Sequence, residues 1–238
     1  MNDATYRLLV GIVDAFLWGG DLIGEQNLPE NGPAIFISNH LGPIGPIGAM
    51  CSIPLRLYSW IVADMLDQEK AAAYLQWDFV ERTLKLKPPL STNFAMLLSK
   101  ITVPMLTSFE TIPAFQGYQD LEGVLKTSVE LLKKGKYIYV CPEDNRLPAD
   151  PLTKMTPFKK GFTRLGELYY AESGQCLRFY PVTVHESRKT VIEKPVVFNP
   201  KFPVAQERLR IKNLLESSIR RKYIELSTEG YRGVTQPD

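Results

Sequence analysis

The chain has 238 residues, and 45% of them are hydrophobic. This is enough for one domain with a real core and too much for a disordered chain. A formal net charge of +2 provides no general attraction for nucleic acid. The three cysteines share no metal-ligand spacing, and the Met1-Asn2-Asp3 start lacks the basic region of a signal peptide. We therefore expect a cytoplasmic protein with reduced thiols and no resident metal.

Residues 5–19 form a largely apolar stretch that predicts a helix, and we treat residues 1–19 as a separate N-terminal element. The stretch is too short for a membrane span and carries Arg7 and Asp14. Two alternatives stay open. The helix packs on the domain, or it lies at a bilayer surface with Trp18 near the headgroups.

The next element is a short buried strand at residues 33–37, followed by Ser38, Asn39, His40 and a turn rich in Gly and Pro. His40 is one of only two histidines. A neutral imidazole is the usual general base for activating a hydroxyl near pH 7. The alternative is that His40 only hydrogen-bonds to loop backbone.

The middle of the chain predicts a helix at 45–53, a strand at 55–62, and two helical stretches at 67–83 and 93–105 that Pro88 and Pro89 separate. Apolar residues at helical spacing then predict a helix over 119–134, with Gly135 as its C-cap, before a strand at 137–141.

That strand leads into Pro142-Glu143-Asp144-Asn145-Arg146. Arginine has the best shape for a two-pronged grip on a phosphate. The alternative for Arg146 is a structural ion pair with Glu143 or Asp144. Lys159 and Lys160 follow, either as helpers in phosphate binding or as a solvated helix start.

The C-terminal part predicts a helix at 161–173, strands at 179–184 and 195–198, a long amphipathic helix at 204–226, and a frayed tail at 227–238. Because strands and helices alternate, we predict an α/β fold, a mostly parallel sheet flanked by helices, over residues 20–226.

In order and spacing, these segments resemble the glycerolipid acyltransferase family, which includes the lysophosphatidate acyltransferases. The resemblance covers roughly residues 20–200. Asn39 and His40 match the start of the family motif Asn-His-x4-Asp, and Cys141–Arg146 matches Phe-Pro-Glu-Gly-Thr-Arg at Pro142, Glu143 and Arg146. The strand at 178–184 loosely matches a fourth motif. The interval 64–107 is longer than is usual in the family, so it is an insertion that covers an acyl tunnel, rests on a membrane, or forms a packing hairpin.

The resemblance implies acyl transfer from an acyl-CoA or acyl-carrier-protein thioester to a lyso-phospholipid or related lipid hydroxyl. It also implies peripheral contact with the cytoplasmic membrane face, no cofactor and no nucleic acid partner. We predict His40 as the catalytic base. The predicted substrate-binding residues are Asn39, Glu143, Arg146 and Lys160.

Two family positions differ in this chain. The motif aspartate is replaced by Gly45, and the segment nearest the second motif, residues 108–115, has no arginine. A different carboxylate would then have to serve His40, and the sequence offers Asp64, Glu143 and Asp144. The alternative function is a non-catalytic lipid-binding relative. A thioesterase-like hydrolase is a third reading.

Overall fold

The computed structural model describes residues 1–42, 44–82, 84–114, 120–144 and 147–234, with side chains through Glu229. The helices in these residues are α1 (Asp3–Val13), α2 (Ile44–Ser52), α3 (Gln68–Leu75), α4 (Leu90–Ser108), α5 (Leu121–Lys133), α6 (Arg164–Ser173) and α7 (Val204–Val234). Two π-helical turns, Asp14–Trp18 and Gln76–Glu81, continue α1 and α3, and 3-10 turns lie at Glu25–Asn27, Ala63–Leu66 and Gly161–Thr163. The strands are β1 (Asp21–Ile23), β2 (Ala34–Ser38), β3 (Leu57–Val62), β4 (Ile112–Ala114), β5 (Tyr137–Val140), β6 (Arg178–Val184), β7 (Lys189–Ile192) and β8 (Val196–Val197).

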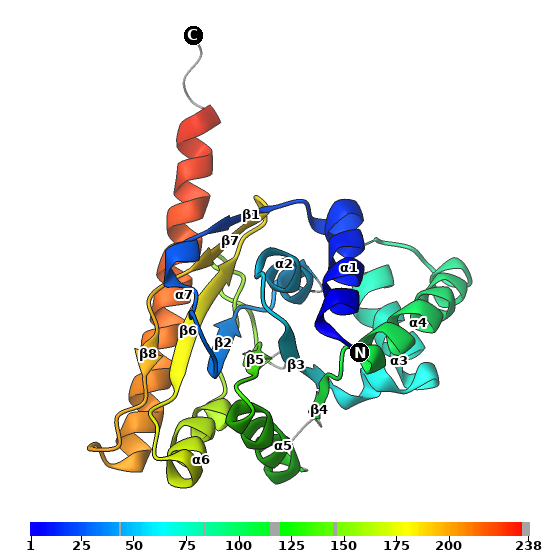
Figure 1. Cartoon of the computed structure of the whole chain (residues 1–238). Coiled ribbons are helices and arrows are strands. Elements are labelled where there is room, and N and C mark those ends of the chain that lie inside the picture. Colours follow the sequence, from blue (N-terminus) through cyan, green and yellow to red (C-terminus); the bar gives the residue numbers. More distant parts are fainter. Residues whose placement is uncertain (43, 83, 115–119, 145–146, 235–238) are drawn as a thin grey trace.

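The strands form one sheet in the order β1-β7-β6-β2-β5-β3-β4, with β8 paired to β6. Strand β2 pairs in parallel with β5 and β6, and β3 pairs in parallel with β4 and β5. Strand β6 runs antiparallel to β7 and β8. Helices flank this sheet (Figure 1). The predicted α/β fold with a mostly parallel sheet is therefore confirmed.

The central strand β2 is buried on both faces, as expected for a parallel strand with helices on either side. Ile35 and Ile37 join a core with α5, α6 and α7. Ala34 and Phe36 point to the other face and pack with Trp18 and α2. Side chains alternate along the strand, so one five-residue segment anchors both layers.

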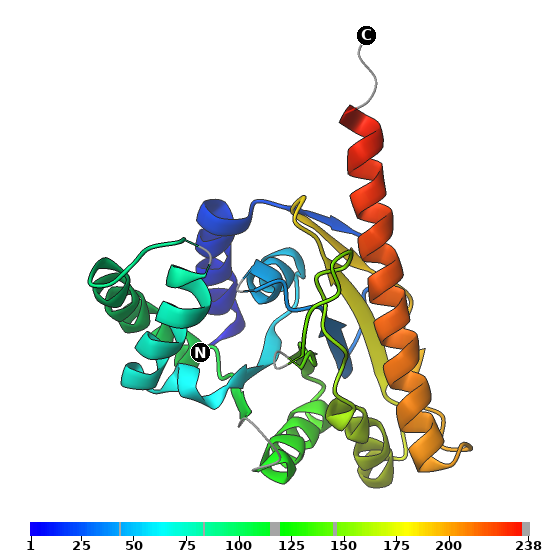
Figure 2. The ribbon, with the colours of Figure 1, turned by 180° about the vertical axis from the view of Figure 1, so that it is seen from behind.

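Helix α7 runs alongside the sheet and extends beyond it, as seen from behind in Figure 2. It continues to Val234, past the end at 226 that the sequence predicts. The extra turn is held by Ser227, whose hydroxyl bonds to the carbonyl of Tyr223 at 3.0 Å and to the His185 ring at 3.0 Å. His185 is buried, and its ring therefore helps to hold this extra turn of α7 against the domain.

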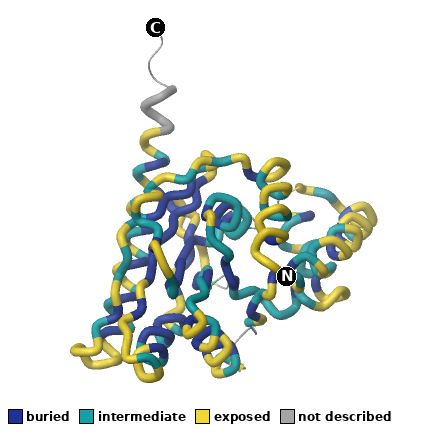
Figure 3. Tube along the Cα trace, in the orientation of Figure 1, coloured by how far each residue is buried: buried dark blue, intermediate teal, exposed yellow. Residues whose placement is uncertain are grey.

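The N-terminal element packs on the domain, which is the first alternative left open by the sequence, and the buried Trp18 contradicts its expected place near lipid headgroups. Tyr6 and Trp18 are buried, and the Trp18 indole N–H donates to Ser52 at 2.8 Å. Phe16, in contrast, is 85% exposed, and Leu8, Ile12 and Leu17 also face outward. The exposed side of α1 stands out in the burial map of Figure 3. This helix therefore packs on the domain through one side and presents large apolar side chains on the other.

The insertion folds as α3, its π-helical turn and α4, and it packs around a small core of Met65, Ala71 and Leu106. It lies next to α1 (Figure 1), where Phe109 stacks edge-on against Tyr6 with 5.1 Å between ring centroids. Helices α3 and α4 both contact the Ala63–Leu66 turn, which in turn contacts β3 and β4, so the insertion joins the domain at this edge of the sheet.

The sequence missed three strands, β1, β4 and β7. All are short, with three or four residues each, and β1 and β4 form the two edges of the sheet. A segment of this length carries too few residues for a periodic pattern, so pairing with neighbours decides its structure.

Candidate functional site

The Asn39–His40 turn is fixed to the end of strand β6. The Asn39 side-chain amide donates to the carbonyl of Val184 at 2.9 Å, and its oxygen accepts from the Val184 N–H at 2.9 Å. Asn39 is buried. These bonds give Asn39 a positioning role, and its predicted contact with a substrate stays a prediction.

Glu143 ties the same turn to the segment after β5. One carboxylate oxygen accepts from the backbone N–H of His40 at 2.6 Å. The other accepts from the backbone N–H of Thr156 at 2.7 Å and from its hydroxyl at 3.2 Å. Burial raises the pKa of Glu143, and these hydrogen bonds act in the opposite direction. The carboxylate thus holds three protein groups, and its predicted contact with a substrate also stays untested.

His40 itself is partly exposed at the carboxyl edge of the sheet, where parallel α/β sheets bind their ligands. Burial lowers the pKa of His40 below its ordinary value of 6.5. The charge of Asp78 and a hydrogen bond to its own backbone raise that pKa, and the charge of Arg82 lowers it. The imidazole is therefore neutral near pH 7 and ready to accept a proton.

Gly45 lies so close to the Asn39–His40 turn that a side chain would not fit without movement. A Cβ at this position would stand 2.9 Å from the carbonyl oxygen of Asn39 and 3.4 Å from the Cα of His40. Both contacts are with backbone. The start of α2 thus packs directly against the turn at the position where the family carries aspartate.

The three carboxylates that the sequence offered for His40 have other partners. Asp64 pairs with Lys70 at 3.9 Å, and Asp144 pairs with Lys159 at 3.4 Å. Glu143 binds the backbone of His40 and not its ring.

The charge of Asp78, a residue that the sequence did not single out, raises the pKa of His40. It lies in the π-helical turn Gln76–Glu81 of the insertion. No motif or spacing relates an aspartate in this region to a histidine in another part of the chain.

The predicted phosphate-binding residues are only partly placed. Arg146 lies outside the described residues. Lys160 is exposed at the start of the Gly161–Thr163 turn. Its neighbour Lys159 donates its backbone N–H to the carbonyl of Pro142 at 2.8 Å, so this lysine pair follows directly on the Glu143 segment.

In the part of the chain that the structure describes, no group of three or more His, Cys, Asp or Glu side chains could hold a metal ion. A cavity of about 560 Å³ lies near the amino-terminal ends of β2 and β6, away from His40. It is lined by residues that include Gly32, Pro33 and Arg178. We assign it no part in the site.

Comparison with known proteins agrees with this geometry. A model of the family described as Acyltransferase matches residues 21–184, which is more than half of the chain. The fold is similar to the crystal structure of the 1-acyl-sn-glycerophosphate (LPA) acyltransferase PlsC from Thermotoga maritima, with a TM-score of 0.52 and 17% identity. That match covers 95% of this chain and 84% of the other. No curated protein sequence matches the chain significantly.

Proposed function

Because the chain belongs to the Acyltransferase family, we propose that it transfers a fatty acyl group from a thioester to a lipid hydroxyl. The donor is an acyl-CoA or an acyl-carrier protein, and the acceptor is a lyso-phospholipid or a related lipid. The observation that carries this proposal is the state of His40. It is a partly exposed, neutral base at the carboxyl edge of the sheet, and Asn39 and Glu143 fix its backbone from two sides.

In the proposed reaction, a ring nitrogen of His40 takes the proton from the acceptor hydroxyl. The hydroxyl oxygen then bonds to the thioester carbonyl carbon, and the carbon–sulfur bond breaks. The departing thiolate takes the proton back from the imidazolium, so the products are an ester and a free thiol. Such general-base assistance is worth about a hundred- to ten-thousand-fold in rate.

The exposed apolar side chain of Ile44, which directly precedes Gly45 at the start of α2, supports a lipid acceptor. Arg146 and Lys160 are proposed to meet an anionic group on the acceptor. Arginine suits that task through its bidentate hydrogen bonds, and lysine supplies a mobile charge.

We further propose that the enzyme works on the surface of the cytoplasmic membrane face, where both thioester donors are available. Helix α4 supports this contact because one of its exposed sides carries large apolar residues, which a helix of a globular protein usually buries. Between residues 90 and 101, the small residues Ser91, Ala95 and Ser99 face the protein, while large apolar residues face solvent; nearer the end of the helix, Leu106 is buried. The outward residues, Leu90, Phe94, Leu97 and Ile101, recur at the spacing of one helical stripe.

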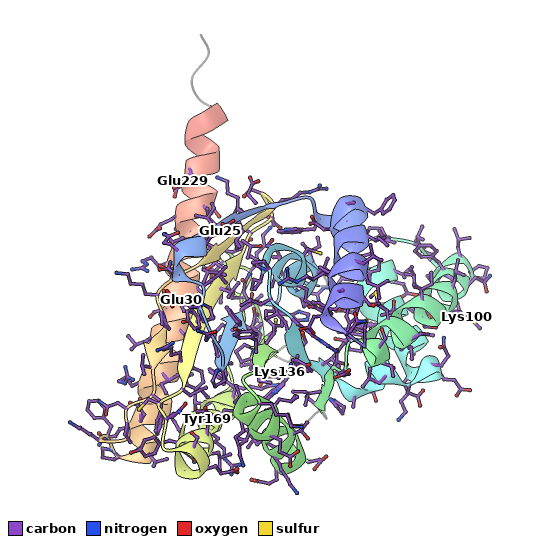
Figure 4. All side chains as sticks on the ribbon, in the orientation of Figure 1. Glu25, Glu30, Lys100, Lys136, Tyr169 and Glu229 are labelled. Atoms are coloured by element: carbon purple, nitrogen blue, oxygen red, sulfur yellow. The ribbon has the colours of Figure 1, made fainter. Side chains whose placement is uncertain are left out.

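This stripe lies on an element next to α1, which carries exposed Leu8, Ile12, Phe16 and Leu17. Lys100, labelled on α4 in Figure 4, points away from the sheet and brings a positive charge to the same helix. Apolar side chains with an adjacent cation are typical of helices that bind anionic bilayers reversibly. No described helix is both long and apolar enough to cross a bilayer.

The alternative function is a lipid-binding relative without catalysis, and Gly45 in place of the motif aspartate favours it. Radiolabelled acyl-CoA and acyl-carrier protein, each incubated with the pure protein and a panel of lyso-phospholipids, separate the two. Transfer that requires His40 supports the enzyme. Lipid binding without turnover in both the wild type and His40→Ala supports the alternative, and thioester cleavage without an acceptor indicates hydrolysis by water.

A further inference from the structure

Helix α7 contributes an arginine to the segment that holds Glu143. The family model ends at residue 184, so this helix lies outside the matched residues. Ile219 of α7 is fully buried in the same core as Met155, which belongs to the segment after β5. Arg220 follows Ile219 directly, and its side chain is 23% exposed. The core packing of the helix therefore fixes where this arginine begins.

The guanidinium of Arg220 binds three groups of the segment after β5. Nη1 donates to the Thr153 hydroxyl at 2.8 Å and to the Met155 carbonyl at 3.4 Å, and Nη2 donates to the Thr156 carbonyl at 3.0 Å. Nε and Nη2 also donate to one carboxylate oxygen of Glu216, one turn earlier on α7, at 3.1 Å and 3.0 Å. Because arginine presents its donors in a rigid planar fork, it can hold all of these acceptors at once.

Thr156 connects this arginine to the candidate catalytic turn. Its backbone N–H and its hydroxyl donate to one carboxylate oxygen of Glu143 at 2.7 Å and 3.2 Å, and the other oxygen accepts from the His40 N–H at 2.6 Å. Thr156 and Glu143 are both buried, so water does not compete for these bonds. A continuous chain of hydrogen bonds thus runs from Arg220 through Thr156 and Glu143 to the backbone of His40.

The charge of Arg220 acts on the same carboxylate. Burial raises the pKa of Glu143, and the hydrogen bonds from His40 and Thr156 together with the charge of Arg220 lower it. The ionised form has two oxygens that only accept hydrogen bonds, which is the form that both neighbours need. Arg220 therefore supports the chain through its hydrogen bonds and through its charge.

We propose that Arg220 is a positioning residue of the catalytic site: through Thr156 and Glu143 it fixes the backbone of His40, and with it the place of the imidazole. Helix α7 then completes a site whose sequence motifs follow β2 and β5. This inference rests on the proposed acyl transfer, but the hydrogen-bond chain is measurable without any substrate.

The direct test follows the backbone amide of His40 by NMR. Isotope-labelled histidine gives two backbone amide signals, because the chain has two histidines, and His185→Gln identifies them. A short hydrogen bond to a carboxylate is strong and deshields the amide proton. In Arg220→Ala the His40 signal should move upfield, because Thr156 no longer holds Glu143 in place. Arg220→Lys keeps the charge and should give a smaller shift.

Arg208→Ala is the matched control. Arg208 also lies on α7, its side chain is 32% exposed, and it donates two hydrogen bonds to the carboxylate of Glu167. Its replacement removes an ion pair of the same helix without touching Thr156, so the His40 signal should stay at its wild-type position. Thermal melts show that each variant is folded at the temperature of the measurement.

Kinetics adds a readout that a loss of stability alone would not change. In the folded enzyme, Arg220→Ala should lower kcat by roughly 10- to 100-fold with little change in KM for the donor, because a base displaced by about 1 Å loses rate on this scale. Arg220→Lys should recover part of the loss. Arg208→Ala should keep kcat near that of the wild type.

The proposal is overturned if folded Arg220→Ala leaves the His40 amide signal unmoved, or if Arg208→Ala moves it equally. An active enzyme whose kcat is insensitive to Arg220→Ala contradicts it as well. Should Arg220→Ala fail to fold, Arg220→Lys, which keeps the aliphatic stem, is judged by the same criteria. If the wild type transfers no acyl group to any acceptor, the proposed function fails while the NMR signal still decides the hydrogen-bond chain.

Discussion

The carboxylate of Glu143 accepts a 2.6 Å hydrogen bond from the backbone N–H of His40, a residue 103 positions earlier in the chain. The bond joins the ends of the adjacent parallel strands β2 and β5. The family motifs that contain these two residues are thus connected through main chain and not through the imidazole. This bond holds the backbone of His40 in place and does not engage its ring.

Replacing Glu143 should therefore affect both stability and turnover. Glu143→Ala leaves the buried N–H groups of His40 and Thr156 without their acceptor, which costs about 1–3 kcal/mol in the free energy of unfolding. Glu143→Gln keeps one acceptor oxygen and should lose less. Urea denaturation of both variants checks this order. Equal stability of Glu143→Ala and the wild type would contradict the assigned role.

His40→Ala should remove most acyl transfer, by about a hundred- to ten-thousand-fold, without unfolding the protein. His185→Gln is the matched control. His185 is buried against Ser187, Ser227 and Tyr223 at the start of the loop after β6, so its replacement should lower stability but leave kcat of the folded enzyme near that of the wild type. Normal turnover by folded His40→Ala would rule out His40 as the base.

Gly45→Asp, which restores the family residue, should not increase activity. Its Cβ would press on the Asn39 carbonyl from 2.9 Å, and backbone cannot rotate away as a side chain can. We expect a cost of roughly 1–3 kcal/mol, as for other overpacked sites, and a displaced His40 turn. Gly45→Ala separates the effects, because it adds the same Cβ without the charge. A stable, faster Gly45→Asp would show that the carboxylate was simply lost.

The pH dependence of the rate follows from the lowered pKa of His40. The base form is lost only when the pH falls below a pKa that is itself below 6.5, so kcat/KM should be level above pH 6.5 and should decline on the acid side of it. Rates measured between pH 5 and 8 check this. A half-maximal rate at a pH above 6.5 would contradict a neutral, partly buried base.

The lowered pKa of His40 also makes the free energy of unfolding depend on pH. The unfolded chain takes up a proton at His40 near pH 6.5, before the folded chain does. The contribution of His40 to the free energy of unfolding is therefore lost as the pH falls from 6.5 toward the folded-state pKa. The difference in unfolding free energy between the wild type and His40→Gln should shrink from pH 7.5 to 5.5.

Membrane contact should depend on the stripe of α4 and on α1. Deleting residues 1–19 is a poor test, since it also removes buried Tyr6 and Trp18. We expect Leu97→Ser with Ile101→Ser to weaken partitioning onto anionic vesicles roughly tenfold or more, because each serine withdraws an apolar side chain from the bilayer. Co-sedimentation measures this.

The matched control is Leu209→Ser. Leu209 is 53% exposed, close to the 56% of Leu97, but it lies on α7, which both ribbon views place on the other side of the sheet from α4. Vesicle binding that falls equally in the control, or that is absent in the wild type, would contradict the proposed surface.

The amino-acid sequence by itself determined the central strands, most helices, and the meeting of His40 with the Glu143 segment. These features follow from local patterns. Runs such as residues 34–38 are apolar enough to be buried on both faces, and the carboxyl ends of parallel strands must meet at one edge of the sheet. The order of the motifs along the chain was therefore sufficient to bring His40 and Glu143 together.

Only the tertiary structure decided that Glu143 holds the backbone of His40, why Gly45 carries no side chain, and which face of α4 meets solvent. Each depends on the distance between groups from separate elements, and local patterns report burial and propensity but not such distances. Gly45 is confined because α2 packs on the Asn39 carbonyl. The packing of the whole chain sets these contacts, so the residues concerned have no signature of their own in the sequence.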